Sequence, residues 1–191
     1  PMEHTAGEKG QETVLRLELK LIADAGLVGL PNAGKSSLLA AISDAHPKIA
    51  AYPFTTLNPI IGTIMFDEFD RFTIADLPGL IQGASQGVGL GDAFLRHVER
   101  APLLIYVVDM AGTDQRNPTQ DYLDLRQEIE LYRQDLMDRP SLIVANKMDL
   151  PEAKENIKEF RKRTRKRPIS VSALTGEGLD TLKDAIYKVE Q

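Results

Sequence analysis

Short apolar runs alternate along this chain with longer segments in which apolar residues recur every three or four positions. The runs at residues 72–75, 103–108 and 142–145 have the length and composition of buried β-strands. The helical period is clearest at residues 117–136 and 179–189. Strands that alternate with helices predict an α/β fold, with a mostly parallel six-stranded sheet and helices on both faces.

Two local signals refine this pattern. The runs at residues 61–66 and 71–75 flank a short polar linker, which predicts a β-hairpin and therefore one antiparallel edge strand. In the first helical segment, Asn117 is the expected N-cap and Pro118 the expected first helical residue. We expect both helical segments to pack against the sheet.

Composition indicates one globular domain with a full core, because 42% of the 191 residues are hydrophobic. The chain has no cysteine, which excludes a disulfide framework and a thiolate metal site and favours a cytoplasmic protein. The longest apolar run, residues 103–108, is far shorter than the roughly 20 residues that span a bilayer. No transmembrane segment is therefore expected.

Charge is distributed unevenly along the chain. The net charge of −5 argues against a uniform attraction to nucleic acid. Residues 158–167 are nevertheless strongly basic. Two interpretations stay open for this stretch: a solvated helix end whose cations suit the helix dipole, or a surface that contacts RNA.

The segment GLPNAGKS at residues 29–36 lies between an apolar run and a helical segment. Its glycines allow backbone N–H groups to turn around a polyphosphate. Lys35 adds a positive charge for the β- and γ-phosphates, and Ser36 offers a hydroxyl to Mg²⁺. The helix that follows points its positive end at the anion. This pattern predicts a P-loop NTPase, although a glycine turn before a lysine also arises by accident.

A second motif, DLPG at residues 76–79, follows its own apolar run. The run would deliver Asp76 to the phosphate end of the sheet, where its carboxylate can hold a water bound to magnesium. Gly79 would permit a backbone N–H to approach the γ-phosphate closely. An isolated motif of this kind is often an ordinary turn, and its order relative to the P-loop favours the functional interpretation.

The third motif, NKMD at residues 146–149, is suited to selecting a base. The carboxylate of Asp149 matches the two donors on the Watson–Crick edge of guanine, N1–H and N2–H₂, and mismatches adenine. By analogy with sites that reject ligands lacking a needed hydrogen-bonding group, we expect discrimination against adenine of roughly 10⁴-fold or more. Lys147 is expected to lay its alkyl stem over the base, and residues 172–174 to offer a backbone N–H to the guanine oxygen.

The chain resembles the GTP-binding domain of the Obg GTPases over nearly its whole length. Beyond the three motifs, the resemblance rests on YPFTTL at residues 52–57, the glycine-rich run at residues 79–91 and FLRHVER at residues 94–100. YchF-type relatives differ in the purine-reading motif and DRG-type relatives differ after the second glycine cluster, so both match less well.

The resemblance implies magnesium-dependent GTP binding and slow GTP hydrolysis, as a nucleotide switch in large ribosomal subunit assembly and the stress response. The implied partners are GTP, GDP, ppGpp and the large ribosomal subunit or its precursor, with its rRNA and proteins. The implied form is a monomer.

The same resemblance assigns roles at the site. Thr56 becomes the switch threonine, which joins Ser36 and Asp76 on Mg²⁺ when a γ-phosphate is present, while residues 54–58 and 79–91 order on GTP and loosen on GDP. Catalytic roles are expected for Lys35, Thr56 and Gly79. The expected nucleotide-binding residues are Gly29, Leu30, Pro31, Asn32, Ala33, Gly34, Lys35, Ser36, Ser37, Phe54, Thr55, Thr56, Leu57, Asn58, Asp76, Leu77, Pro78, Gly79, Asn146, Lys147, Met148, Asp149, Ser172, Ala173 and Leu174.

One residue that many GTPases use for hydrolysis is absent. They orient the attacking water with a glutamine directly after the DxxG glycine, whereas this chain has Leu80. An aliphatic side chain forms no hydrogen bond with water, which predicts slow intrinsic hydrolysis. Asn32 suggests K⁺ as a second cofactor, because its side-chain carbonyl could help hold that ion; the alternative is a small polar residue in an exposed turn.

Two functions remain open at this point. In one, GTP hydrolysis drives release from a preribosomal particle; in the other, the chain is a nucleotide-gated binding module in which hydrolysis is incidental. The presence of Lys35, Ser36, Asp76 and Asp149 argues against a purely structural domain.

The first residues differ from the rest. Residues 15–21 alternate strictly between apolar and polar side chains, which predicts a half-buried strand. We expect residues 1–21 to be the last strand and linker of a missing N-terminal domain, glycine-rich by the family resemblance, and residues 22–191 to form the GTP-binding domain.

Overall fold

The computed structural model describes residues 10, 23–49, 59–67, 70–77, 98 and 101–190. Several sequence-based expectations fall outside these residues: the strand at residues 15–21, the switch segment at residues 54–58, Pro78, and the glycine-rich run at residues 79–91 with Leu80.

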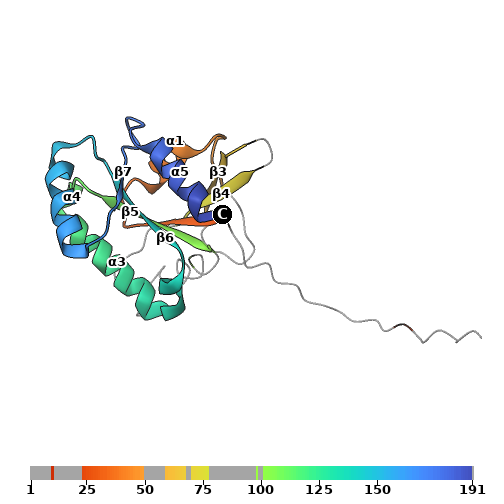
Figure 1. Ribbon diagram of the computed structural model, residues 1–191, viewed down its shortest axis with the longest axis horizontal. Coiled ribbons are helices and arrows are strands. Elements are labelled where there is room, and N and C mark those ends of the chain that lie inside the picture. The colour runs from red at the N-terminus through yellow and green to blue at the C-terminus, as the bar shows by residue number, and fades with distance from the viewer. Residues whose placement is uncertain are drawn as a thin grey trace, which may run out of the picture.

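In the part of the chain that the structure describes, seven strands form one sheet in the order β2-β3-β4-β1-β5-β6-β7 (Figure 1). Strands β4, β1, β5, β6 and β7 run parallel, while β3 is antiparallel to both β2 and β4. The strands are β1 (Ala25–Val28), β2 (Lys48–Ile49), β3 (Ile60–Met65), β4 (Arg71–Asp76), β5 (Leu103–Asp109), β6 (Ser141–Asn146) and β7 (Ile169–Ser170).

The sheet confirms the expected α/β class and the hairpin of β3 and β4, and it corrects two details. The described residues form seven strands rather than six, and the antiparallel strand β3 does not lie at the edge. The added edge strand, β2, has only two residues, which is too short to show any alternation in sequence. It pairs with backbone groups of β3 that would otherwise form an open edge.

Helices cover both faces of the sheet, as the alternating pattern predicted (Figure 1). One face carries α1 and α5, and the other carries α3 and α4. The strands β1 and β5 are therefore buried on both sides, which accounts for their continuous apolar sequence. The helices among the described residues are α1 (Lys35–Ile42), α3 (Pro118–Tyr132), α4 (Pro151–Thr164) and α5 (Leu179–Glu190), with short 3-10 helices η2 (Thr113–Gln115) and η3 (Gln134–Asp138).

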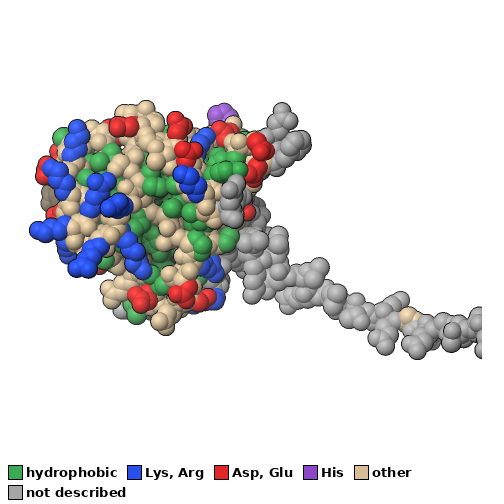
Figure 2. Space-filling model, viewed as in Figure 1, with side chains coloured by type: hydrophobic (Ala, Val, Ile, Leu, Met, Phe, Trp, Pro, Cys, Tyr) green, Lys and Arg blue, Asp and Glu red, His purple; other side chains and the backbone are tan. Residues whose placement is uncertain are grey.

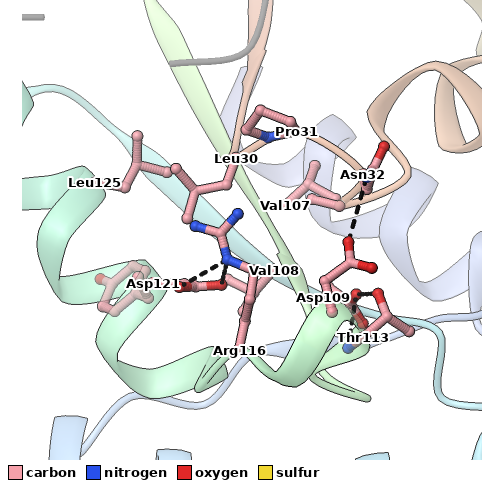
Figure 3. A pocket seen from close by; sticks show the side chains of 13 residues that line it. Leu30, Pro31, Asn32, Val107, Val108, Asp109, Thr113, Arg116, Asp121 and Leu125 are labelled. Carbon is pink, nitrogen blue, oxygen red and sulfur yellow. Dashed lines mark hydrogen bonds and ion pairs between the residues drawn. The ribbon is translucent and has the colours of Figure 1, made fainter. Parts of the chain in front are cut away.

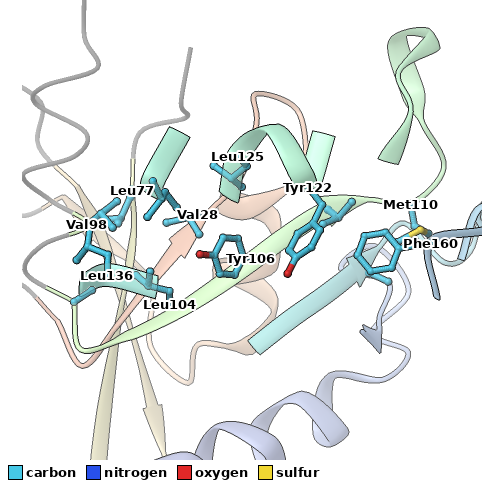
Figure 4. Close-up of a cluster of buried hydrophobic side chains, with 14 of the residues drawn as sticks. Val28, Leu77, Val98, Leu104, Tyr106, Met110, Tyr122, Leu125, Leu136 and Phe160 are labelled. Atoms are coloured by element: carbon cyan, nitrogen blue, oxygen red, sulfur yellow. The ribbon is translucent and has the colours of Figure 1, made fainter. Parts of the chain in front are cut away.

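Aromatic rings join α3 and α4 to the sheet. The ring centroids of Tyr106 on β5 and Tyr122 on α3 are 5.6 Å apart, and Phe160 on α4 lies 5.2 Å from Tyr122 (Figure 4). Phe160 is fully buried. Burial of a side chain of this size stabilises a fold by roughly 1.5–3 kcal/mol, so these rings fix both helices on the sheet.

The helical segment expected at residues 117–136 is shorter than its period suggested. Helix α3 ends at Tyr132, and Arg133 adopts an extended backbone with φ of −155°. Leu136 instead lies in η3 and is still buried. The apolar spacing therefore predicted the burial of Leu136 correctly and its secondary structure wrongly, because a 3-10 turn directs the same side chain into the core.

The start of α3 matches the expected cap. The side-chain Oδ1 of Asn117 accepts a hydrogen bond of 3.0 Å from the backbone N–H of Gln120, and Pro118 is the first helical residue. We predict that Asn117→Ala lowers stability by about 1 kcal/mol, which corresponds to roughly 2–4 °C in Tm for a chain of this size. Thermal unfolding by circular dichroism measures the effect. Asn117→Ser, which keeps an acceptor, should stay within about 1 °C, and an equal loss in both variants would contradict the cap.

The fold brings five loops together at one end of the sheet. Because β1, β4, β5, β6 and β7 are parallel, their carboxyl ends meet at the same edge, where open α/β sheets bind ligands. None of the described helices has both the length and the apolar composition that a bilayer crossing requires.

Candidate functional site

Most of the buried polar side chains gather at the carboxyl edge of the sheet. Among the described residues, five polar or charged side chains are buried, and only Thr119 lies elsewhere, on α3. Burying polar groups is costly unless they are paired or used, so such a cluster marks a candidate functional site. Its members are Lys35, Asp76, Asn146 and Ser172.

The loop between β1 and α1, residues 29–34, has the glycine requirement expected of a P-loop. A Cβ on Gly29 would lie 2.5 Å from the carbonyl oxygen of Val107. Gly34 has φ of +87°, and a Cβ there would lie 2.4 Å from Nδ2 of Asn146. Both positions therefore require glycine, one for close packing and the other for packing and backbone conformation.

Helix α1 begins without a side-chain cap. Its N-cap is Gly34, and its first turn contains no acidic residue. The first N–H groups of a helix have no intrahelical acceptor, so they remain available to an anion, which the positive end of the helix dipole also attracts.

Lys35 points back into this loop. Its Nζ donates to the carbonyl oxygens of Gly29 at 3.0 Å and Leu30 at 3.3 Å. Burial lowers the pKa of Lys35, and the nearby carboxylate of Asp76 opposes that effect. The loop thus holds an ammonium group at its centre. A phosphate bound there would stabilise the positive charge of Lys35, which burial disfavours.

Ser36 and Asp76 meet beside the loop. The Ser36 hydroxyl donates to Oδ2 of Asp76 at 2.5 Å, while Oδ1 of Asp76 is buried and has no hydrogen-bond partner among the described residues. Burial raises the pKa of Asp76, which the Ser36 hydrogen bond and the charge of Lys35 partly offset. An orphaned carboxylate oxygen beside a hydroxyl oxygen fits a hard divalent cation such as Mg²⁺.

The remaining surroundings also fit that ion. The described residues contain no group of three or more His, Cys, Asp or Glu side chains that could enclose a metal. Mg²⁺ is usually bound by one or two protein oxygens together with waters and substrate phosphates. The third expected ligand, Thr56, lies outside the described residues.

We predict that Asp76→Asn removes most of the effect of Mg²⁺ on nucleotide binding. Calorimetric titration with a non-hydrolysable GTP analogue, in Mg²⁺ and in EDTA, should show that Mg²⁺ strengthens binding to the unchanged chain, and that this gain falls at least tenfold in the variant, about 1.4 kcal/mol. The exposed Asp184 on α5 supplies the control variant Asp184→Asn. A full magnesium effect in Asp76→Asn would contradict the assignment.

A pocket of about 300 Å³ adjoins the loop, at the lower end of the range for small-molecule sites. Asp149 lies on its wall, and Oδ1 of Asp149 accepts a hydrogen bond of 2.6 Å from the Ser172 hydroxyl. All its lining residues except Leu150 were expected at the site from the sequence. They are Gly34, Ser37, Asn146, Lys147, Asp149, Leu150, Ala173 and Leu174.

Asn146 connects the loops around this pocket. Its Nδ2 donates to the carbonyl oxygen of Ala33 at 3.0 Å, and its Oδ1 accepts from the backbone N–H of Ala173 at 3.1 Å. The side chain therefore ties the P-loop to the loop after β7. The sequence predicted that a backbone N–H of residues 172–174 contacts the guanine oxygen. In this structure the N–H of Ala173 donates to Asn146 instead.

Lys147 is held by residues that the sequence interpretation missed. Its Nζ lies 2.8 Å from Oδ2 of Asp109 and 2.9 Å from Oγ1 of Thr113, and the Thr113 hydroxyl also donates to Asp109. The ammonium is thereby anchored while the side chain lines the pocket. Asp109 directly follows the apolar run at residues 103–108, as Asp76 and Asn146 follow theirs, and this position was the signal that could have revealed it.

Asn32 contacts the same turn after β5. Its Nδ2 donates to Oδ2 of Asp114 at 3.3 Å, and Figure 3 shows this loop facing the turn with Asp109 and Thr113. The amide nitrogen of Asn32, rather than the carbonyl oxygen expected to assist K⁺, makes the contact. Asn32 has φ of +63°, a conformation that asparagine adopts more readily than most residues.

The described residues bring most of the expected site residues to this edge of the sheet: residues 29–37, Asp76, Asn146, Lys147, Asp149 and residues 172–174. Two others belong to the core instead, because Leu77 is fully buried in the hydrophobic cluster between the sheet and α3, and Met148 packs against that cluster. The expected residues at positions 54–58, 78 and 79 lie outside the described part of the chain.

Solved structures share this architecture. The G domain of the T. maritima FeoB iron transporter matches with a TM-score of 0.65 and 27% identity, over 87% of this chain and 98% of that domain. Aquifex aeolicus Era, solved with GDP and AlF₄⁻, matches with a TM-score of 0.63 and 23% identity, over 86% of this chain and 56% of that chain. The fold is that of a P-loop GTPase domain.

Sequence comparison is more specific. Residues 24–147 match the family model described as 50S ribosome-binding GTPase. The GTPase Obg of Akkermansia muciniphila is 52% identical over 187 residues, which cover 97% of this chain and 53% of that protein. The GTPase Obg of Syntrophomonas wolfei is 51% identical over 185 residues, covering 97% of this chain and 44% of that protein. The chain spans about half the length of these relatives, and it belongs to the 50S ribosome-binding GTPase family and, within that family, to the Obg GTPases.

Proposed function

We propose that this chain binds GTP and GDP together with Mg²⁺ and hydrolyses GTP slowly. The observation that carries the proposal is the meeting of a glycine-shaped phosphate loop and the Asp149 carboxylate in one pocket, joined by Asn146. The family membership supports it, because the matching relatives are named GTPases.

The proposal assigns each group of site residues a role. The first N–H groups of α1 and the ammonium of Lys35 hold the phosphates, and Asp149 reads the guanine edge. Ser36 and Asp76, with Thr56, would hold Mg²⁺, which supplies positive charge where negative charge develops on the phosphate oxygens. Lys35 and the N–H of Gly79 add to that stabilisation, because phosphoryl transfer depends mainly on positioned charge.

Slow turnover follows from Leu80, which replaces the water-orienting glutamine of many GTPases. Faster hydrolysis then requires a group from outside this glutamine position. We propose two sources, K⁺ bound beside Asn32 or a bound partner. The Asn32 side chain would have to turn its carbonyl oxygen toward the phosphates, away from its present contact with Asp114.

In the cell, we propose a cytoplasmic nucleotide switch that acts in large ribosomal subunit assembly and in the stress response, where ppGpp competes for the same pocket. The description of the matching family, 50S ribosome-binding GTPase, supports the ribosomal part. Leu80 favours a second candidate, a binding module gated by GTP, GDP or ppGpp in which hydrolysis is incidental. Release from a ribosomal particle with GTP but not with a non-hydrolysable analogue supports the first, and equal release supports the second.

Direct titration tests the nucleotide specificity. In Mg²⁺, the chain should bind GDP at least 10³-fold more tightly than ADP, since a site built for specific hydrogen bonds strongly rejects a ligand that lacks them. Equal affinity for GDP and ADP would overturn the proposal.

Single-turnover hydrolysis tests the chemistry. The rate should lie far below 1 s⁻¹, as for unassisted switch GTPases, and should be lost in Lys35→Ala. The same rate measured in KCl and in NaCl buffer tests the role of K⁺. Equal hydrolysis rates in the two buffers would show that K⁺ has no role. Unassisted turnover above 1 s⁻¹ would contradict the role assigned to Leu80.

A further inference from the structure

Helix α4 and the residues after it carry an exposed set of cations that the nucleotide site does not use. Lys154, Lys158 and Arg161 follow one another at intervals of four and three residues, so they share one face of the helix, and Arg165 is the C-cap residue directly after α4. Figure 2 shows the Lys and Arg side chains gathered over the side of the molecule where Figure 1 places α4. We name this set the basic surface: Lys154, Lys158, Arg161, Lys162, Arg165, Lys166 and Arg167, all exposed.

Most of these cations lack an acidic partner. Lys158 pairs with Glu155 at 2.8 Å. For the side chains of the other six, the described part of the chain provides no ion pair or hydrogen bond. Helix α4 also carries Glu152, Glu155 and Glu159, but residues 151–167 hold eight Lys or Arg against these three acidic residues, in a chain whose net charge is −5. Six unpaired cations close together repel one another, which a polyanionic partner would relieve.

Helix stability accounts for only part of this arrangement. Three cations in the last turn of α4, including Arg161 and Lys162, suit the negative end of the helix dipole. The dipole effect falls off within one turn. It therefore explains neither Lys154, near the start of the helix, nor Lys166 and Arg167, which lie beyond its end.

A hollow of about 270 Å³ continues the basic surface. Arg126 of α3 and Ser141 of β6 line it together with Lys166 and Arg167, and none of its lining residues is acidic. The guanidinium carbon of Arg126 lies 6.0 Å from the ring centroid of Tyr122. Three cations and a hydroxyl around one hollow are suited to a phosphate group.

The dimensions and composition favour a nucleic acid backbone. From Lys154 to its end at Thr164 the helix rises about 15 Å, a distance over which one strand of a duplex presents several phosphates, about one every 3.4 Å. Phe160, the one aromatic residue of α4, and Tyr122, which lines the hollow, are both buried, whereas surfaces that bind single strands stack bases on exposed aromatic rings. Duplex RNA is recognised mainly by shape and by phosphate and 2′-hydroxyl contacts.

We propose that the basic surface binds the phosphate backbone of double-stranded RNA. The choice of RNA rests on the ribosomal part of the proposed function. Lys166 and Arg167 precede β7, and Ser141 begins β6, so this end of the surface lies at the amino ends of the strands, opposite the nucleotide pocket. RNA and nucleotide therefore bind at the same time.

Fluorescence anisotropy with a 20-base-pair RNA duplex tests the proposal. The triple variant Arg161→Gln/Arg165→Gln/Lys166→Gln should weaken binding at least tenfold, and the slope of log affinity against log salt should fall by roughly 2–3, because each phosphate that is no longer neutralised lowers the slope by about one. The matched control is Lys48→Gln/Arg71→Gln/Lys188→Gln, which removes the same charge from β2, β4 and α5 and should stay within twofold.

Three outcomes would overturn the proposal: equal losses in the two triple variants, no salt-dependent RNA binding by the unchanged chain, or tighter binding to vesicles with 20% phosphatidylserine than to RNA. If the triple variant fails to fold, the single variant Arg161→Gln should still lower the salt slope by about 1, and an unchanged slope overturns the proposal. GDP titration of every variant distinguishes a failure of the RNA proposal from a failure of the proposed nucleotide binding. Normal GDP affinity together with unaltered RNA binding in the triple variant would overturn the RNA proposal alone.

Discussion

The Asp149→Asn variant is expected to lose GDP affinity by roughly 10³- to 10⁴-fold, the range by which sites built for a hydrogen bond reject a ligand that lacks it, and to gain affinity for XDP. A carboxylate accepts from both N1–H and N2–H₂ of guanine, whereas an amide turns its NH₂ toward the guanine NH₂. Xanthine carries a carbonyl at that position, so it accepts from the new amide while N1–H still donates to the amide oxygen.

The surroundings of Asp149 should tolerate the exchange. Its Oδ1 accepts from the Ser172 hydroxyl at 2.6 Å, and the amide oxygen of asparagine can accept the same bond. Ser172 is fully buried and its hydroxyl also accepts from the backbone N–H of Thr175 at 3.1 Å, so the hydroxyl is oriented independently of residue 149. The replaced side chain therefore keeps its position, and the change acts on base recognition.

Calorimetry with GDP, XDP and ADP measures this switch. Asp184→Asn makes the same chemical change on the exposed part of α5 and should leave all three affinities unchanged. If Asp149→Asn weakened GDP and XDP alike, residue 149 would support the pocket without reading the base.

The pattern of the chain was enough to predict how the site is assembled. Each of Asp76 and Asn146 follows an apolar run, and parallel strands place such residues at one edge whatever the details of packing. The glycines of the loop were likewise predictable, because a P-loop needs backbone conformations that other residues resist. Local sequence patterns were therefore enough to predict the strand topology and the placement of Asp76, Asn146 and the P-loop glycines.

Contacts between loops were not predictable in the same way. Lys147 is anchored by Asp109, which lies 38 positions earlier in the sequence, and by Thr113, which lies 34 positions earlier. No hydrophobic periodicity predicts contacts between residues so far apart. Asn146 was expected to belong to the nucleotide site, yet its amide nitrogen bonds to the P-loop and its amide oxygen bonds to the loop after β7. Buried polar groups acquire such partners from tertiary packing, which single-residue chemistry does not reveal.

The Gly34→Ala variant is expected to destabilise the chain by about 2–4 kcal/mol and to weaken GDP binding at least 100-fold. Alanine at φ of +87° costs roughly 1–2 kcal/mol of backbone strain, and its Cβ would lie 2.4 Å from Nδ2 of Asn146. Relief of that clash must displace either the phosphate loop or the Asn146 side chain, and both line the nucleotide pocket.

Gly176→Ala separates the two causes. Gly176 has φ of +84°, but nothing lies within 4 Å of a Cβ there, so this control carries the strain without the clash. Its Tm should fall by roughly 2–4 °C for each kcal/mol of strain, with GDP affinity within twofold of the unchanged chain. A double-mutant cycle with Asn146→Ala, which removes the clashing atom, should return a coupling of at least about 1 kcal/mol between residues 34 and 146. Additive effects in that cycle would show that Gly34 is required for its backbone conformation alone.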